Sequence, residues 1–381
     1  MRITHVTGYE VVVPCRSGVT TSAMYGPAIF DQTSKIIIEV QTNVGLIGLG
    51  ETMRGTPEES LRSGIERIGE LDWAQFCLQE PPLQDLSAHD MYGHIVPDRP
   101  HRLWETSFSN GNEMAIHAVL LDLLGKQAGV PAAALMGGAY RNRIPVDYWM
   151  GRMTPEDSAR VCRAAKKLGY RGVKCKCALE DDIVERAEAI REACGTDFKI
   201  TFDPNGRFYR PAEAMPMFRR LAALGNTGCL EDPFPASDLE WWRLVRQQGL
   251  FPLALGTVYG GVLIEAIRAH ACDYANLNGL PWHIRKAGDV CWAAGMRTWH
   301  GSGLDLGILE ALYRHTCAAT KSMTLPSDIL GRSIREHNLV TDAMPVERGT
   351  VSLPTGPGLG VELDRDAMEQ YIVRRFTIEV K

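Results

Sequence analysis

Two lysines in the stretch RGVKCKC are placed where they could do chemistry. Successive side chains of a β-strand point to opposite faces, so Lys174 and Lys176 would share one face. The apolar residues between and beside them would lie on the other face. On an exposed strand at the edge of a sheet, such lysines would only keep that edge soluble. Inside a barrel they would be costly to bury unless they serve a ligand. The pattern therefore indicates either an edge strand or two cations directed at a binding site.

Acidic and basic side chains also end several later segments that have the pattern of strands. KITFD ends in Asp203, GCLE ends in Glu231, and MRTWH ends in His300. A single acid in such a place often does no more than open a turn. Two carboxylates on neighbouring parallel strands, beside two lysines on the strand before them, are oxygen ligands of the kind that Mg²⁺ prefers. The sequence thus predicts acids and lysines gathered at one end of a sheet.

These residues lie in a region where short apolar segments alternate with amphipathic ones, from about Ile144 to Asp328. The predicted strands are IPVDYW, GVKCK, KITFD, GCLE, PLALG, YANLN, MRTWH and SMTLPSD. Among the helices between them, we expect 155–168, 181–193, 211–224 and 262–270. Eight strands that alternate with helices favour a parallel α/β barrel. An open doubly wound sheet fits less well, because no GxGxxG motif follows a strand.

The first part of the chain has a different pattern. KIIIEVQTNVGLIGLGET holds two apolar runs on either side of 42–45, which predicts a β-hairpin. EMAIHAVLLDLLGKQAG predicts a helix that stops at Gly129. We therefore expect an α+β capping domain over 1–130, a barrel over 131–340, and a C-terminal segment, 341–381, that returns to the cap.

The composition argues against several classes of protein. The 381 residues include 41 Lys and Arg against 46 Asp and Glu, a net charge of −5 without a basic run, so binding to nucleic acid or to a membrane surface has no support. The most apolar window, LFPLALGTVYGGVLIEAI, contains a proline, glycines and Glu265, unlike a membrane helix. Ten cysteines are scattered rather than spaced as a disulfide framework, and the N-terminus lacks a signal-peptide pattern. We expect reduced thiols and a cytoplasmic protein.

Taken in order, the motifs resemble the enolase superfamily, in its mandelate racemase and muconate lactonizing branch. The segment AIHAVLLDLLGKQAGVPAAALMGGAYRNRIPVDYW resembles the junction between that family's capping domain and its first barrel strand. GVKCKC resembles its Lys-x-Lys motif, FDPNGRF and CLEDPF its first two metal-ligand strands, and HIRKAGDVCWAAGMRTWH the helix and strand that deliver a histidine. The resemblance implies a (β/α)7β barrel, a variant of the TIM barrel, with an α+β cap that the C-terminal tail completes.

The resemblance also implies a reaction. Family members remove the proton α to a carboxylate and form an enediolate stabilised by a metal ion. By resemblance Asp203 and Glu231 would hold Mg²⁺, and Lys176 would be the base on one face of the substrate. Lys174 would lower the pKa of Lys176 and contact the carboxylate, since a lysine acts as a base near neutral pH only when its pKa falls. His300 would act on the opposite face.

Two positions depart from the family pattern. The third metal ligand, usually an acid that ends the fifth strand, falls on Gly256 or Thr257, so we expect one carboxylate to be missing and Mg²⁺ to bind weakly with help from the substrate. At the end of the sixth strand, Asn278 stands where racemases of the family carry an Asp. An amide cannot stabilise an imidazolium, so His300 would be a weaker base.

Further residues are candidates for substrate binding. They lie in the loops that follow the strands or in the segment where the family places a loop over its active site: Asn205, Asp232, Tyr25 and Trp282. Asp305 and Asp328 also lie near strand ends and could assist.

The expected reaction is dehydration of a hydroxy or sugar acid, since this needs one good base and one acid. Racemisation or epimerisation of an α-substituted acid is the alternative, and it needs competent bases on both faces. The departures also leave open a barrel that binds a carboxylate without chemistry, and a metal-free enzyme in which Lys174 anchors the carboxylate. The expected partner is a small carboxylate, without nucleic acid or membrane. Relatives suggest a homo-oligomer, from dimer to octamer.

Overall fold

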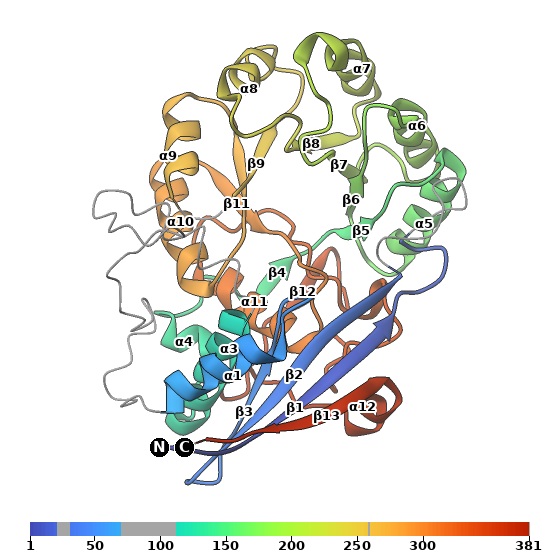
Figure 1. Cartoon of the computed structure of the whole chain (residues 1–381). Coiled ribbons are helices and arrows are strands. Elements are labelled where there is room, and N and C mark those ends of the chain that lie inside the picture. The colour runs from blue at the N-terminus through green and yellow to red at the C-terminus, as the bar shows by residue number, and fades with distance from the viewer. Residues whose placement is uncertain (21–30, 70–111, 258–259, 381) are drawn as a thin grey trace.

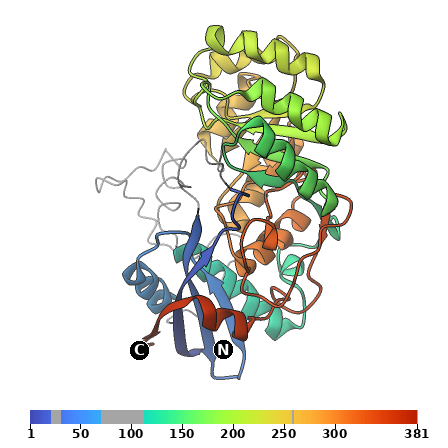
Figure 2. The ribbon, with the colours of Figure 1, turned by 90° about the vertical axis from the view of Figure 1, so that its right-hand side faces the viewer.

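The computed structural model describes residues 1–20, 31–69, 112–257 and 260–380. Figure 1 shows two units: a four-stranded sheet with helices beside it, and a curled seven-stranded sheet surrounded by helices. Figure 2 shows them stacked, with both chain termini at the outer end of the four-stranded sheet. No helix in these ranges is both long and apolar enough to cross a membrane.

The four-stranded sheet is antiparallel, in the order β13-β1-β2-β3. Its strands are β1 (Ile3–Pro14), β2 (Gln32–Thr42), β3 (Ile47–Glu51) and β13 (Ile372–Ile378). β2 and β3 form the predicted hairpin, and Gly45 in its turn has φ 79°, a conformation that glycine adopts without strain. Since β13 pairs with β1, the C-terminal segment completes the N-terminal sheet, as predicted.

Three helices accompany this sheet: α1 (Glu58–Gly69), α3 (Asn112–Ala128) and α4 (Ala132–Leu135). The predicted helix EMAIHAVLLDLLGKQAG corresponds to α3. Its Ala115 and Val119 are buried in one cluster with Ile36 and Ile38 of β2. Burying such aliphatic side chains stabilises the unit by roughly 1.5–3 kcal/mol for each large one.

The seven-stranded sheet is parallel and confirms the predicted α/β barrel. Its strands are, in sheet order, β5 (Tyr148–Met150), β6 (Gly172–Lys176), β7 (Lys199–Asp203), β8 (Thr227–Glu231), β9 (Leu253–Thr257), β10 (Tyr274–Leu277) and β11 (Arg297–His300). The helices between and after them are α5 (Pro155–Lys167), α6 (Ile183–Cys194), α7 (Pro211–Leu224), α8 (Leu239–Arg246), α9 (Gly261–Arg268), α10 (Pro281–Ala293) and α11 (Gly307–Ala319).

The predicted helix boundaries are most accurate where capping residues, proline or glycine mark the ends. The Oγ1 of Thr154 accepts a hydrogen bond from the N–H of Asp157 at 3.2 Å and caps α5. α7 has proline at its first position and stops before Gly225, whose φ is 77°. Both helices begin at the predicted residue, and α7 also ends at the predicted one.

The first and last predicted strands differ from the structure. IPVDYW is divided, because β4 (Arg143–Pro145) pairs with β12 (Thr350–Ser352) and only β5 joins the barrel. The segment 322–328 closes the barrel through one isolated bridge on each side, Val146–Ser327 and Thr298–Met323. Pro326 has no N–H to donate, which prevents a regular ladder there. The remaining elements are the short helices η3 (Gly331–Ser333) and α12 (Arg365–Tyr371).

Lys35 of β2 joins the two units through buried ion pairs. Its Nζ donates to Glu51 Oε1 and to Asp305 Oδ1, each at 2.7 Å, and all three side chains are buried. Glu51 also accepts the N–H groups of Leu306 and Leu309 at the start of α11. Because Asp305 lies in the loop after β11, this contact fixes the loop against the cap.

Removing this cation should destabilise the protein strongly. We expect Lys35→Met to lower the free energy of unfolding by about 3–5 kcal/mol, because it leaves two buried carboxylates without a cation. Urea unfolding followed by circular dichroism measures the loss. Arg375→Met is the matched control: Arg375 pairs with Glu369 at the surface, and such pairs contribute about 1 kcal/mol or less. Equal losses of stability in the two variants would contradict the conclusion that the buried ion pairs of Lys35 stabilise the protein.

Buried histidines should make the fold sensitive to acid. His315 on α11 accepts the N–H of Ala133 at Nδ1, at 3.3 Å, and therefore donates from Nε2 to the oxygen of Leu359, at 3.1 Å. Burial lowers its pKa to about 4, and burial lowers the pKa of His117 in α3 to about 4 as well. In the unfolded chain a histidine titrates near 6.5. The unfolded state thus binds more protons between pH 6.5 and 4.

Stability should be complete above pH 6.5 and fall as the pH drops towards 4, by up to about 3 kcal/mol for each of these histidines. Urea unfolding at pH 7, 5.5 and 4.5 measures the slope. His315→Gln keeps a donor and an acceptor but cannot titrate, so the slope should become flatter. His5→Gln, at an exposed position of β1, should leave it unchanged. An unaltered slope in His315→Gln would exclude this cause.

Candidate active site

A cavity of about 550 Å³ lies at the carboxyl ends of the barrel strands. The residues lining it include Lys174, Lys176, Asp203, Glu231, Asp232 and Asn205. Both lysines of β6 therefore face the interior of the barrel. The cysteines that alternate with them, Cys175 and Cys177, are buried on the other side of the strand. β6 is bonded to β5 and β7, so it is not an edge strand.

Lys174 lies among three carboxylates. Its Nζ is 2.8 Å from Glu231 Oε1, 2.9 Å from Asp328 Oδ2 and 3.3 Å from Asp203 Oδ2. Burial acts to lower the pKa of Lys174, but the three carboxylates, Asp328 first, outweigh it and raise the pKa well above its usual value. Lys174 is therefore a fixed cation in the wall of the cavity.

Lys176 is more accessible and has fewer acidic partners. Its Nζ pairs with Asp203 Oδ2 and donates to Asn205 Oδ1 at 2.8 Å. The N–H of Asn205 in turn donates to Asp203 Oδ1 at 3.0 Å, in a turn where Asn205 has φ 49°. This turn holds the Nζ of Lys176 at the carboxyl end of β6, where it can reach a molecule bound in the cavity.

Asp203, Glu231 and Asp232 form a compact acidic group. One oxygen from each lies within 4.8 Å of the others, and Glu231 Oε2 is buried without a hydrogen-bond partner among the described residues. Burial, followed by repulsion from Asp203, raises the pKa of Glu231 to about 8 and that of Asp232 to about 7. Carboxylates held this close repel one another, so the group fits a divalent cation with oxygen ligands.

The structure argues against the expectation that a third carboxylate is missing, because Asp232 lies in one group with Asp203 and Glu231. Asp232 has φ 44°, and its carboxylate extends to β9, where the N–H of Gly256 donates to Oδ1 at 2.7 Å. A Cβ on residue 256 would collide with Asp232 Oδ2. Glycine at 256 thus leaves room for an acid that comes from the end of β8. The side chain of Thr257, the other candidate at this strand end, lies outside the described residues.

Two asparagines at the end of β10 line the same cavity. Asn276 is buried and its Nδ2 donates to Glu231 Oε1 at 2.6 Å. Asn278, the expected residue, lies beyond the strand, and its Nδ2 is 3.4 Å from Asn276 Oδ1. Asn276 was not among the residues predicted from the sequence. The available signal was the alternation that puts residues 274, 276 and 278 on one face of an extended chain.

His300 ends β11 but is not among the residues that line the cavity. It is buried, and its ring stacks on that of Tyr313 from α11 with 3.6 Å between centroids. Its Nδ1 donates to the oxygen of Leu277 at 3.0 Å, while Nε2 is buried without a partner among the described residues. Burial lowers the pKa of His300. Tyr313, which was not among the residues predicted from the sequence, lines the cavity in front of it.

The other candidates have different surroundings. Trp282 on α10 lines a separate pocket with Leu121 and Met136. Asp305 is paired with Lys35, and Asp328 with Lys174. Tyr25 lies outside the described residues. The structure thus brings together residues from β6, β7, β8 and β10, with Tyr313 from α11.

Comparisons with known proteins identify the family of the chain. A family model described as enolase C-terminal domain-like matches residues 156–367. The N-succinyl-L-Arg/Lys racemase of Bacillus cereus is 24% identical over 385 residues, which cover 98% of each chain. The arabinonate dehydratase of Saccharolobus solfataricus is 25% identical over 350 residues, 88% of this chain and 90% of that one.

Solved structures agree as well. The crystal structure of the Bacillus cereus N-succinyl Arg/Lys racemase aligns over 100% of both chains, with a TM-score of 0.76 and 21% identity. Muconate lactonizing enzyme aligns over 98% of this chain and 100% of its own, with a TM-score of 0.72 and 17% identity. The chain belongs to the enolase superfamily, in its mandelate racemase and muconate lactonizing enzyme family.

Proposed function

We propose that this protein removes the proton α to the carboxylate of a small hydroxy or sugar acid and then eliminates water. Abstraction of such a proton is the chemistry of the superfamily to which the chain belongs. The choice of dehydration rests on one observation, the difference between the two walls of the cavity. Lys176 projects from one wall. The described lining residues of the other wall include the amides of Asn276 and Asn278, and also Ser302 and Tyr313. His300 lies behind Tyr313.

Asp203, Glu231 and Asp232 are the residues that would hold Mg²⁺, and two features support this. Their oxygens are close enough to share an ion, and Glu231 Oε2 has no other partner among the described residues. Bound there, the ion would supply positive charge for the oxygens of the substrate carboxylate. Weak binding that depends on the substrate is no longer expected, since the site has three carboxylates.

The side chains of the protein then have separate roles. Lys174, fixed as a cation, attracts the substrate carboxylate. Lys176 accepts the α-proton at Nζ, and Asn205 holds that nitrogen in place. The electron pair of the broken C–H bond forms the new double bond, and the β-hydroxyl leaves as water after it takes a proton. In this proposal Lys176, protonated by the first step, returns that proton to the departing hydroxyl, so one side chain acts first as base and then as acid.

Racemisation or epimerisation is the second candidate. The similarity to a racemase over 98% of the chain favours it. It requires a base on each face of the α-carbon. His300 would have to reach the substrate past Tyr313, against which its ring is stacked.

Isotope exchange tests the proposal. The protein is incubated in D₂O with a set of hydroxy and sugar acids, with Mg²⁺ or with EDTA, and followed by NMR and mass spectrometry. Loss of water that requires Mg²⁺ is the expected result. Deuterium at an inverted α-carbon, without loss of water, would establish the racemase instead. No exchange with any acid, while Mg²⁺ binds, would point to a barrel that binds carboxylates without chemistry.

A further inference from the structure

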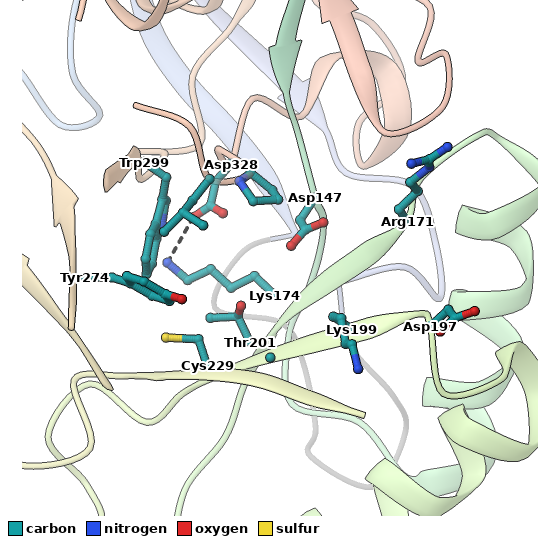
Figure 3. Close-up of a pocket in the computed structure, with 13 residues that line it drawn as sticks. Asp147, Arg171, Lys174, Asp197, Lys199, Thr201, Cys229, Tyr274, Trp299 and Asp328 are labelled. Atoms are coloured by element: carbon teal, nitrogen blue, oxygen red, sulfur yellow. Dashed lines mark hydrogen bonds and ion pairs between the residues drawn. The ribbon is translucent and has the colours of Figure 1, made fainter. Parts of the chain in front are cut away.

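A second cavity, of about 290 Å³, lies at the opposite end of the barrel. Its lining includes Lys199 and Tyr274, which begin β7 and β10, and it extends inward to Lys174 and Asp328. Lys174 lines both cavities and therefore lies between them. The proposed reaction uses no other residue of this second cavity, which is shown in Figure 3.

Asp147 is the feature of this cavity that calls for a ligand. It lies just before β5, lines the cavity and is 8% exposed. No described residue donates a hydrogen bond to its carboxyl group. Burial, and then repulsion from Asp328, raise the pKa of Asp147 to about 8. A buried carboxyl group without a partner is costly, and a ligand that brings a cation or a donor would remove that cost.

Lys174 does not serve as the cationic partner of Asp147. The Nζ of Lys174 is already held by Asp328, Glu231 and Asp203. Asp328 is likewise paired with Lys174. Asp147 is therefore the acid in the interior of this cavity that has no cation of its own.

The facing wall is aromatic. Figure 3 shows Tyr274 and Trp299 together on one side of the cavity, with Asp147 on the other side of Lys174. Aromatic side chains offer a large apolar surface, and a second ring packed against them gains about 0.5–1.5 kcal/mol beyond the burial of its area. Leu325 and Pro326 add apolar surface to the lining. An apolar body with one positive charge fits this combination better than an inorganic ion does.

The rim carries charges of both signs, Arg171 and Lys199 against Asp197, and all three are exposed. In Figure 3 the side chains of Arg171 and Lys199 point away from the interior. Exposed charges interact weakly, by about 1 kcal/mol or less, because water screens them. The buried carboxyl group and the aromatic wall therefore decide the preference of the site.

We propose that this cavity binds a small organic ammonium ion, with its nitrogen at Asp147 and its apolar body against Tyr274 and Trp299. The volume lies at the lower end of the range of ligand pockets, which suits a molecule with one ring or one branched chain. The proposal does not depend on the reaction at the other end of the barrel.

Calorimetric titration of the full-length protein with benzylamine tests the proposal, with benzyl alcohol and benzoate as the neutral and anionic analogues. We expect benzylamine to bind at least tenfold more tightly than either. Asp147→Asn should weaken benzylamine binding at least tenfold. Asp197→Asn is the matched control, since it removes an acid from the exposed rim, and it should change the affinity less than twofold. Equal affinity for the amine and the alcohol, or tighter binding of benzoate, would overturn the proposal.

A second variant locates the binding without altering Asp147. Leu325 is partly exposed in the lining, so Leu325→Trp should fill the opening and abolish binding, while thermal melting confirms that the variant is folded. Leu244→Trp, on the exposed face of α8, is the control and should bind normally. Benzylamine that still binds to folded Leu325→Trp, or that Mg²⁺ displaces, would be located in the active-site cavity and would refute the proposal.

Discussion

Lys176→Ala is expected to lower the rate of α-proton exchange by about 10³-fold, while the protein stays folded. Lys176 is the lysine that reaches the cavity with a single carboxylate partner, whereas Lys174 is fixed among three. Loss of a positioned general base typically costs about 10²- to 10⁴-fold in rate. Deuterium uptake from D₂O, followed by NMR on a substrate identified with the native protein, measures the effect.

Two further variants separate the role of the base from that of the charge. Lys176→Arg keeps the positive charge but cannot give up its proton near neutral pH, so it should lose exchange as fully as Lys176→Ala. Lys167→Ala, an exposed lysine at the end of α5, should exchange at the native rate. Exchange at near-native rate in Lys176→Arg would show that the charge matters and that another group removes the proton.

The sequence was sufficient to predict the barrel and the acids and lysines at the carboxyl ends of its strands. A strand of five residues leaves little freedom: once β6 is a buried strand, alternation alone places Lys174 and Lys176 on one side. The same holds for Asp203 and Glu231, because parallel strands end at the same edge of the barrel. Helix boundaries were clear where proline and glycine mark them, as at α7.

The sequence could not show what depends on contacts between distant segments. His300 lies behind Tyr313 because α11 packs against the end of β11, and neither the spacing nor the type of these residues indicates that stacking. The segment 322–328 has a strand-like composition but closes the barrel through two isolated bridges. The role of Asp232 depends on a left-handed turn after β8 and on an absent side chain at Gly256, two features more than 20 residues apart.

The second prediction with a large expected effect concerns Asp232. We expect Asp232→Asn to weaken Mg²⁺ binding at least about tenfold, since even residues that only support a metal ligand change affinity by about 10- to 100-fold. Calorimetric titration with Mg²⁺ measures the change without a substrate. Asp182→Asn, at an exposed position before α6, is the control and should bind Mg²⁺ as the native protein does. Unchanged affinity in Asp232→Asn would exclude Asp232 as a ligand.

The space that Asp232 shares with residue 256 allows a sharper test. Gly256→Glu alone should weaken Mg²⁺ binding and lower the melting temperature, because its Cβ would collide with Asp232 Oδ2 and displace the third carboxylate. Gly256→Glu with Asp232→Ala removes the collision and supplies an acid from the end of β9. It should bind Mg²⁺ more tightly than either single variant. Because the two residues compete for one space, their effects must depend on each other. If the losses of Mg²⁺ affinity in the two single variants simply add in the double variant, neither residue 232 nor residue 256 supplies the third carboxylate.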